Sequence, residues 1–94
     1  MPTNSALREA FDAALEVTRR EKVAGMTCLD GSSAMDNLDQ LERELLAEQL
    51  RAIERGVVDK DWFQATVRWL VGWVPETDLN LIGALGRIAR AKPE

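Results

Sequence analysis

The stretch AMDNLDQLERELLAEQLRAIERG, residues 34–56, decides the fold of this 94-residue chain. Leucine recurs within it at intervals of three and four residues, which places apolar side chains on one side of an α-helix. Ser33 and Asp36 have the spacing of a capping box at its start, and Gly56 favours a left-handed stop at its end. We therefore predict a long helix over residues 34–55.

Three further helices are expected around it. Asn4 or Ser5 can cap the first, Asp59 or Asp61 the third and Thr77 the fourth. No alternating run of β-branched residues indicates a strand. The predicted helices cover residues 5–23, 34–55, 60–74 and 78–91, with a connector loop at 24–33. The sequence thus predicts an all-α, compact four-helix domain with short connections, a single domain over residues 1–94.

The composition excludes several kinds of chemistry. The chain has no histidine and one cysteine, with 46% hydrophobic and 30% charged residues. Zinc fingers, disulfide scaffolds and Ser-His or Cys-His nucleophile systems all need residues that are missing here. We therefore expect no metal and no cofactor, and a non-catalytic protein rather than an enzyme.

The cellular compartment can also be predicted. Cys28 cannot form an intramolecular disulfide, which favours a reducing cytoplasm and an inert thiol. The longest apolar stretch, residues 67–74, is too short to span a bilayer and contains Arg68. We expect no membrane partner.

Acidic residues are concentrated between Asp30 and Glu48, where there are six acids and one base. We expect four of them to form an acidic face on the long helix: Asp36, Asp39, Glu44 and Glu48. Such a face repels phosphate, which argues against direct nucleic-acid binding, and attracts a basic protein surface.

Two polar residues, Glu42 and Gln49, fall in the middle of the apolar arc of the long helix. They are seven residues apart and therefore point the same way, about 10 Å from each other along the axis. In a structural interpretation they lie in a groove between two neighbouring helices and pair with an arginine or water. In a functional interpretation they form a strip that binds a ligand or fixes the register of a helix dimer.

Tryptophan is the most distinctive feature of the predicted helix over residues 60–74. Trp62, Trp69 and Trp73 share one stripe, which suits either the core or the centre of an interface. Gly83 and Gly86 lie inside the last helix, where each costs about 1 kcal/mol relative to alanine. We expect a closely approaching helix or tryptophan to offset that cost, and we predict these five residues as interface candidates.

These features favour a non-catalytic, cytoplasmic protein–protein interaction module. We expect a homodimer whose acidic face covers a basic partner surface, as an inhibitor, immunity or anti-defence protein does.

The alternative is a small-molecule-binding protein or helical enzyme that uses Glu42 and Gln49 with an arginine such as Arg68. The stretch Met35–Arg55 resembles the long helix of the all-helical chorismate mutases in its acidic, leucine-rich composition. That resemblance implies arginines, a lysine and a glutamate or glutamine converging in a helical bundle. The arginines of this stretch fall on the side of the helix opposite Glu42 and Gln49: Arg43, Arg51 and Arg55.

Overall fold

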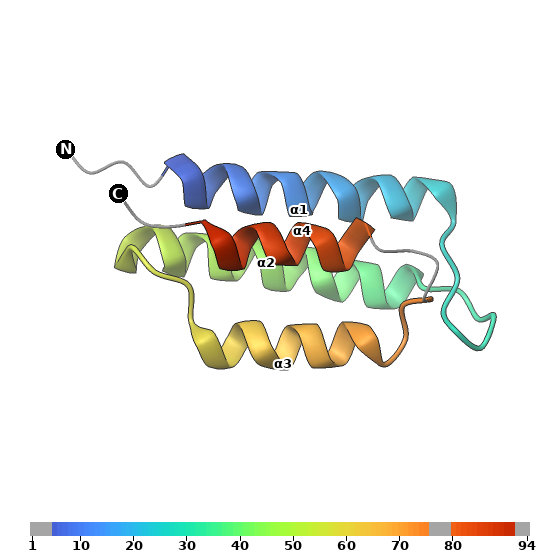
Figure 1. Cartoon of the computed structure of the whole chain (residues 1–94). Coiled ribbons are helices and arrows are strands. Elements are labelled where there is room, and N and C mark those ends of the chain that lie inside the picture. The colour runs from blue at the N-terminus through green and yellow to red at the C-terminus, as the bar shows by residue number, and fades with distance from the viewer. Residues whose placement is uncertain (1–4, 76–79, 92–94) are drawn as a thin grey trace.

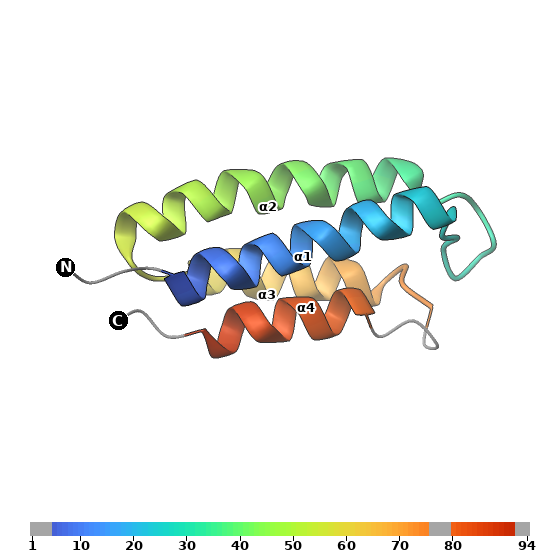
Figure 2. The same ribbon diagram turned by 90° about the horizontal axis from the view of Figure 1, so that it is seen from above.

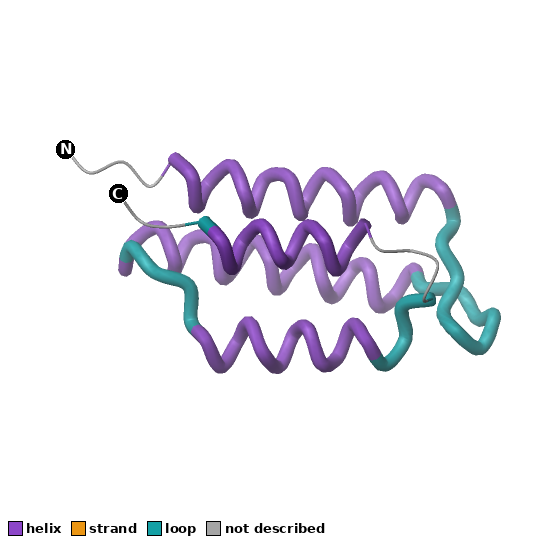
Figure 3. Tube along the Cα trace, in the orientation of Figure 1, coloured by secondary structure: helices purple, strands orange, loops and turns teal. Residues whose placement is uncertain are grey.

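A computed structural model describes residues 5–75 and 80–91 of the chain. This part of the chain forms four α-helices and no strand: α1 (Ser5–Ala24), α2 (Met35–Arg55), α3 (Lys60–Val71) and α4 (Asn80–Arg90). Consecutive helices run in opposite directions, so the start of α1 and the end of α4 lie at the same end of the bundle (Figures 1 and 3). The predicted compact all-α four-helix domain is confirmed.

The helices occupy the corners of a diamond. In Figure 1, α1 lies above α3, and Figure 2 shows α2 and α4 on either side of them. Helix α1 approaches both α2 and α4 closely, and α3 approaches α4. Among the described residues, by contrast, no Cα of α2 lies within 8 Å of a Cα of α3. The α2–α3 side is therefore the open side of the bundle, and only side chains close it.

The core forms where the apolar stripes of the helices meet. On α1 the buried face includes Leu7, Phe11 and Leu15. Thr18 continues this face and donates its hydroxyl hydrogen to the carbonyl oxygen of Ala14, at 2.7 Å, so its buried oxygen has a partner. The stripes that meet these residues from the other helices include Leu38, Leu41, Leu45, Leu70, Leu81, Leu85 and Ile88.

Local signals at the ends of α2 and α3 explain the turn between them. Gly56 adopts a φ of 79° and ends α2 in the left-handed conformation predicted from the sequence. The carboxylate of Asp59 accepts the backbone N–H groups of Asp61 and Trp62, so Asp59 is the N-cap of α3. The capping box predicted at the start of α2 does not form. Ala34 is the N-cap and no side chain caps it; the hydroxyl of Ser33 accepts the N–H of Met35 at 3.2 Å instead.

Helix α3 is shorter than predicted. It ends at Val71, not residue 74, because the N–H groups of Gly72 and Trp73 turn back to carbonyls three residues earlier, Trp69 and Leu70. Pro75 follows shortly and disfavours helical geometry before it. Trp73 consequently lies beyond α3. The predicted cap Thr77 and the predicted start of the last helix at residue 78 lie outside the described residues.

The loop between α1 and α2 is hydrogen-bonded to the segment that follows α3. Residues 25–34 form a loop held by a single antiparallel bridge between Thr27 and Ser33. The N–H of Leu29 in this loop donates to the carbonyl oxygen of Trp73 at 2.9 Å. The first loop and the end of α3 therefore meet at one end of the molecule.

Candidate functional site

The strip formed by Glu42 and Gln49 lies along the contact between α1 and α2. Glu42 accepts Arg19 Nε at 2.7 Å and Lys22 Nζ at 3.2 Å. Gln49 donates its amide hydrogens to the Asp12 carboxylate at 2.9 Å and to the Arg8 carbonyl oxygen at 3.3 Å. Glu42 pairs with an arginine, as the structural interpretation expects. The strip faces one neighbouring helix, α1, rather than a groove between two helices.

Charge pairing shifts the pKa of Glu42 and the pKa of its α1 partner Lys22. Hydrogen bonds from Arg19 and then Lys22 lower the pKa of Glu42, because they stabilise its charged form. Hydrogen bonds to Asp39 and then Glu42 raise the pKa of Lys22. Both shifts keep the groups ionised at neutral pH. Glu42 therefore acts as a fixed negative partner for α1 rather than as a proton donor or acceptor.

The predicted acidic face does not exist as one surface. Only Asp36 and Glu44 are exposed, and Asp39 is bound to Lys22 Nζ at 2.6 Å on the side of α1. Glu48 is fully buried, so its assignment to an exposed face was wrong. The reason is geometric: each residue turns the helix by about 100°, so acids close in sequence point to different neighbours.

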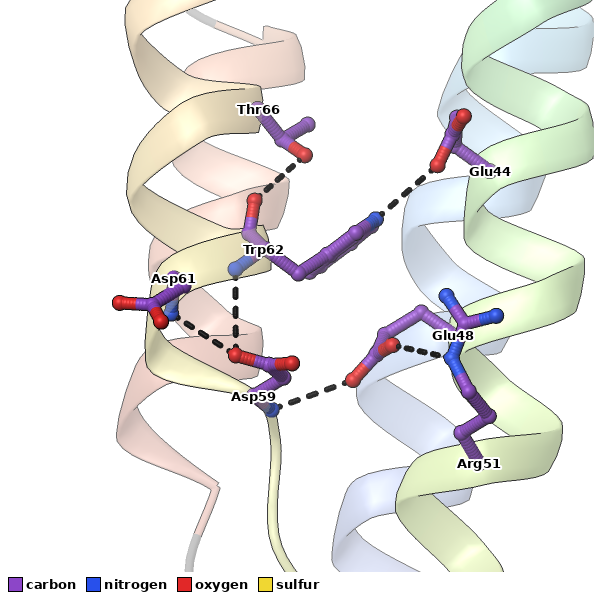
Figure 4. Close-up of polar contacts among 7 residues, drawn as sticks. All are labelled: Glu44, Glu48, Arg51, Asp59, Asp61, Trp62 and Thr66. Carbon is purple, nitrogen blue, oxygen red and sulfur yellow. Dashed lines mark hydrogen bonds and ion pairs between the residues drawn. The ribbon is translucent and has the colours of Figure 1, made fainter.

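Glu48 is a buried carboxylate on the open side of the bundle. One oxygen accepts Arg51 Nε at 2.9 Å, and the other accepts the backbone N–H of Asp59 at 3.1 Å (Figure 4). Asp59 is itself the N-cap of α3. Glu48 thus joins α2 to the first residue before α3, and sequence reasoning missed this role because Glu48 looks like an ordinary surface acid.

Trp62 bridges the two helices next to Glu48. Its indole N–H donates to Glu44 Oε2 at 3.2 Å, and its side chain extends from α3 toward α2 (Figure 4). Its ring also contacts Phe11, with the ring centroids 6.1 Å apart. Between α2 and α3 lies a hollow of about 190 Å³. We call it the α2–α3 groove; its lining residues are Gln40, Glu44, Trp62, Ala65, Thr66 and Trp69.

The other predicted interface residues have varied surroundings. Trp73 is only 8% exposed, and its ring stacks edge-on with Trp69 at a centroid distance of 5.2 Å, so Trp73 belongs to the core of the monomer. Trp62 and Trp69 are half-buried. The close neighbour expected at Gly83 is missing, because a Cβ there would have no atom within 4 Å; at Gly86 it would meet only Arg90 of the same helix.

An apolar edge on α2 remains uncovered. Leu46 and Leu50 belong to the apolar arc that the sequence predicts for this helix, but they are 41% and 72% exposed. The half-buried Ile53 continues this line along the helix. We call these three residues the α2 apolar edge. The prediction failed because α1 covers α2 only as far as Glu42 and Gln49, and no described helix packs beyond them.

Two further hollows lie near α4. One of about 290 Å³ is mainly apolar and opens between the α2–α3 turn and α4; it is lined in part by Val57, Phe63 and Ile88. The other lies between α1 and α4, beside Glu9 and Arg87. Neither Glu42 nor Gln49 lines any of the three hollows.

The described residues contain no group of three or more His, Cys, Asp or Glu side chains arranged to hold a metal ion. None of the helices in this part of the chain has both the length and the hydropathy of a membrane span. Cys28 is a free thiol. No protein-family model, curated protein or solved structure matches the chain.

Proposed function

We propose that this protein is a non-catalytic, cytoplasmic protein–protein interaction module that forms a homodimer through the α2 apolar edge. The observation that carries the proposal is the exposure of Leu46 and Leu50, one turn apart on the longest helix. Exposed apolar side chains that cluster in this way are typical of interaction sites. The free thiol of Cys28 fits a reducing compartment.

The charges beside this edge favour a second copy of the chain as the partner. In an antiparallel pairing of two α2 helices, setting Leu46 against Leu50 of the second copy brings Arg43 within one residue of register with Glu54. Arg43 and Glu54 are both exposed. A two-fold axis repeats each contact, so one such pairing provides two apolar contacts and two charge pairs of opposite sign.

The contacts of Glu42 and Gln49 give less support to the alternative of a small-molecule site. Their partners all belong to α1, and Arg68 lies exposed on α3. Arg68 therefore lies on α3, whereas Glu42 and Gln49 face α1, so the three side chains do not form one site.

The proposal is tested by measuring mass in solution with light scattering after size exclusion, over a range of concentrations. The wild type is expected to be a dimer and Leu50→Glu a monomer, because a charge cannot be buried unpaired at the centre of the contact. Val23→Glu is the matched control: Val23 is 91% exposed on α1, and its substitution should leave the dimer intact. A monomeric wild type, or a dimeric Leu50→Glu, would contradict the proposal.

Charge reversal tests the antiparallel arrangement itself. Arg43→Glu or Glu54→Arg alone should weaken the dimer, and the double variant should restore it. A double variant that is weaker than both single variants would rule out this register.

A further inference from the structure

We infer that the α2–α3 groove binds the guanidinium group of an arginine side chain presented by a basic protein partner. This site is separate from the α2 apolar edge. Glu44 is about 120° around the helix from Leu50 and about 160° from Leu46, so the two surfaces face different directions. The inference therefore does not rest on the proposed homodimer.

The groove carries a negative charge that no cation neutralises among the described residues. Glu44 is exposed on the wall of the groove, and no lysine or arginine among residues 5–75 and 80–91 forms an ion pair with it. Its Oε2 accepts the indole N–H of Trp62, which fixes the carboxylate at the mouth of the groove (Figure 4). A positioned carboxylate without a cation favours a charged donor from outside.

Aromatic rings line the groove on its α3 side. Trp62 and Trp69 line the same hollow from α3, one on each side of Thr66 in the sequence, and both are half-buried. The face of an indole ring attracts a cation more strongly than the ring of any other side chain. A cation in this groove would therefore meet negative charge from α2 and aromatic rings from α3.

The size and shape of the groove suit a single planar side chain. The groove has a volume of about 190 Å³, below the range of about 300–1,000 Å³ that is typical of small-molecule sites. It therefore suits one side chain better than a whole ligand. A planar guanidinium can stack on an indole while it donates several hydrogen bonds in its own plane. Glu44 and the amide oxygen of Gln40, both on the α2 wall, are acceptors for those bonds.

Thr66 has no hydrogen to offer a ligand. Its hydroxyl donates to the carbonyl oxygen of Trp62 at 2.7 Å, within the same helix. The polar side chains of the α2 wall, Gln40 and Glu44, are acceptors, and the indole rings come from α3. This arrangement lets one guanidinium use both walls at once.

The test is an NMR titration of the full chain with the capped peptide acetyl-Gly-Arg-Gly-amide at low salt. The three indole N–H signals give a direct reading, because Trp62 and Trp69 line the groove and Trp73 is in the core. We expect saturable shifts of the Trp62 and Trp69 signals, with a dissociation constant of roughly millimolar size, as suits a single side chain. No saturable shift at about 50 mM peptide would overturn the inference.

The ligand chemistry is tested with matched peptides. The same peptide with citrulline, which is neutral and nearly isosteric, should not bind. A lysine peptide should bind more weakly, because an ammonium group cannot stack as a guanidinium does. Equal binding by citrulline, or tighter binding by the lysine peptide or by tetramethylammonium, would overturn the assignment to arginine.

The site is tested by substitution on α2. Glu44→Gln should weaken binding of the arginine peptide by about three- to ten-fold, the effect of losing a charged partner at an exposed site. Asp36→Asn removes the same charge from an exposed position of the same helix and should leave the affinity unchanged. Equal affinities for the two variants would show that only the net charge matters, and would overturn the site. Circular dichroism confirms that both variants keep the helical fold.

Discussion

The two sides of α2 show two ways of joining helices. On the α1 side the backbones approach closely, and ion pairs such as that of Glu42 with Arg19 run along the edge of the contact. On the α3 side the backbones stay apart, and large or buried polar side chains fill the space, among them Trp62 and Glu48. Partly exposed ion pairs tolerate the loss of one partner, because water replaces it. Buried polar groups do not, so the open side should be the more sensitive one.

The largest effect is expected for Arg51→Met. Glu48 has no exposure to solvent, and Arg51 supplies its charged partner. Removing that partner leaves a buried carboxylate with only one N–H donor, which should lower the free energy of unfolding by about 3 kcal/mol in urea denaturation. Adding Glu48→Leu removes the buried charge, so the double variant should be more stable than Arg51→Met alone.

Arg55→Met is the control for this experiment, because Arg55 is exposed on the same helix and lies outside the α2 apolar edge. It should change the free energy of unfolding by less than about 0.5 kcal/mol. A similarly small loss for Arg51→Met would show that Glu48 does not depend on Arg51.

A smaller effect is expected for Trp62→Phe. The indole N–H of Trp62 donates to Glu44, whereas the buried N–H of Trp73 has no partner among the described residues. Trp73→Phe removes an unsatisfied donor but also buried core contacts, so its two effects oppose each other. Trp62→Phe loses a hydrogen bond at a half-buried position and should lower the free energy of unfolding by about 1 kcal/mol in urea denaturation. An unchanged free energy of unfolding for Trp62→Phe would show that its bond to Glu44 does not stabilise the fold.

The smallest effect is expected on the α1 side. Glu42→Gln should lower the free energy of unfolding by less than about 1 kcal/mol at neutral pH, since exposed ion pairs contribute little. The pKa of Glu42 is lowered in the folded state, so its contribution is present above the ordinary glutamate pKa and is lost as the pH falls through the lowered value. Denaturation curves of wild type and Glu42→Gln should therefore differ at neutral pH and converge in strong acid.

The sequence predicts the helices better than it predicts what surrounds each side chain. The stop at Gly56 and the cap at Asp59, one of the two residues predicted for it, follow from rules that involve only neighbouring residues, and both are confirmed. The burial of Glu48 depends instead on which helix lies beside α2 and at what distance. Periodicity gives the width of an apolar arc, but it does not say how much of that arc a neighbour covers.

The same reason explains the exposed α2 apolar edge. Leu46 and Leu50 belong to the apolar arc in the sequence, and a further neighbour of α2, besides α1 and α3, would be needed to bury them. For the candidate sites, the sequence identified the relevant residue types, including Glu44, Trp62 and Trp69, but assigned them to two unrelated surfaces. Their meeting in one groove depends on the antiparallel turn between α2 and α3.

The hydrogen bond from Leu29 to Trp73 has a consequence for hydrogen exchange. An amide in an exposed loop usually exchanges its proton with solvent after a small local opening. The N–H of Leu29 is bound to a carbonyl oxygen 44 positions later in the chain, and α2 and α3 lie between the two residues. Its exchange therefore requires the first loop and the end of α3 to separate. This single amide would report whether the two halves of the bundle stay together.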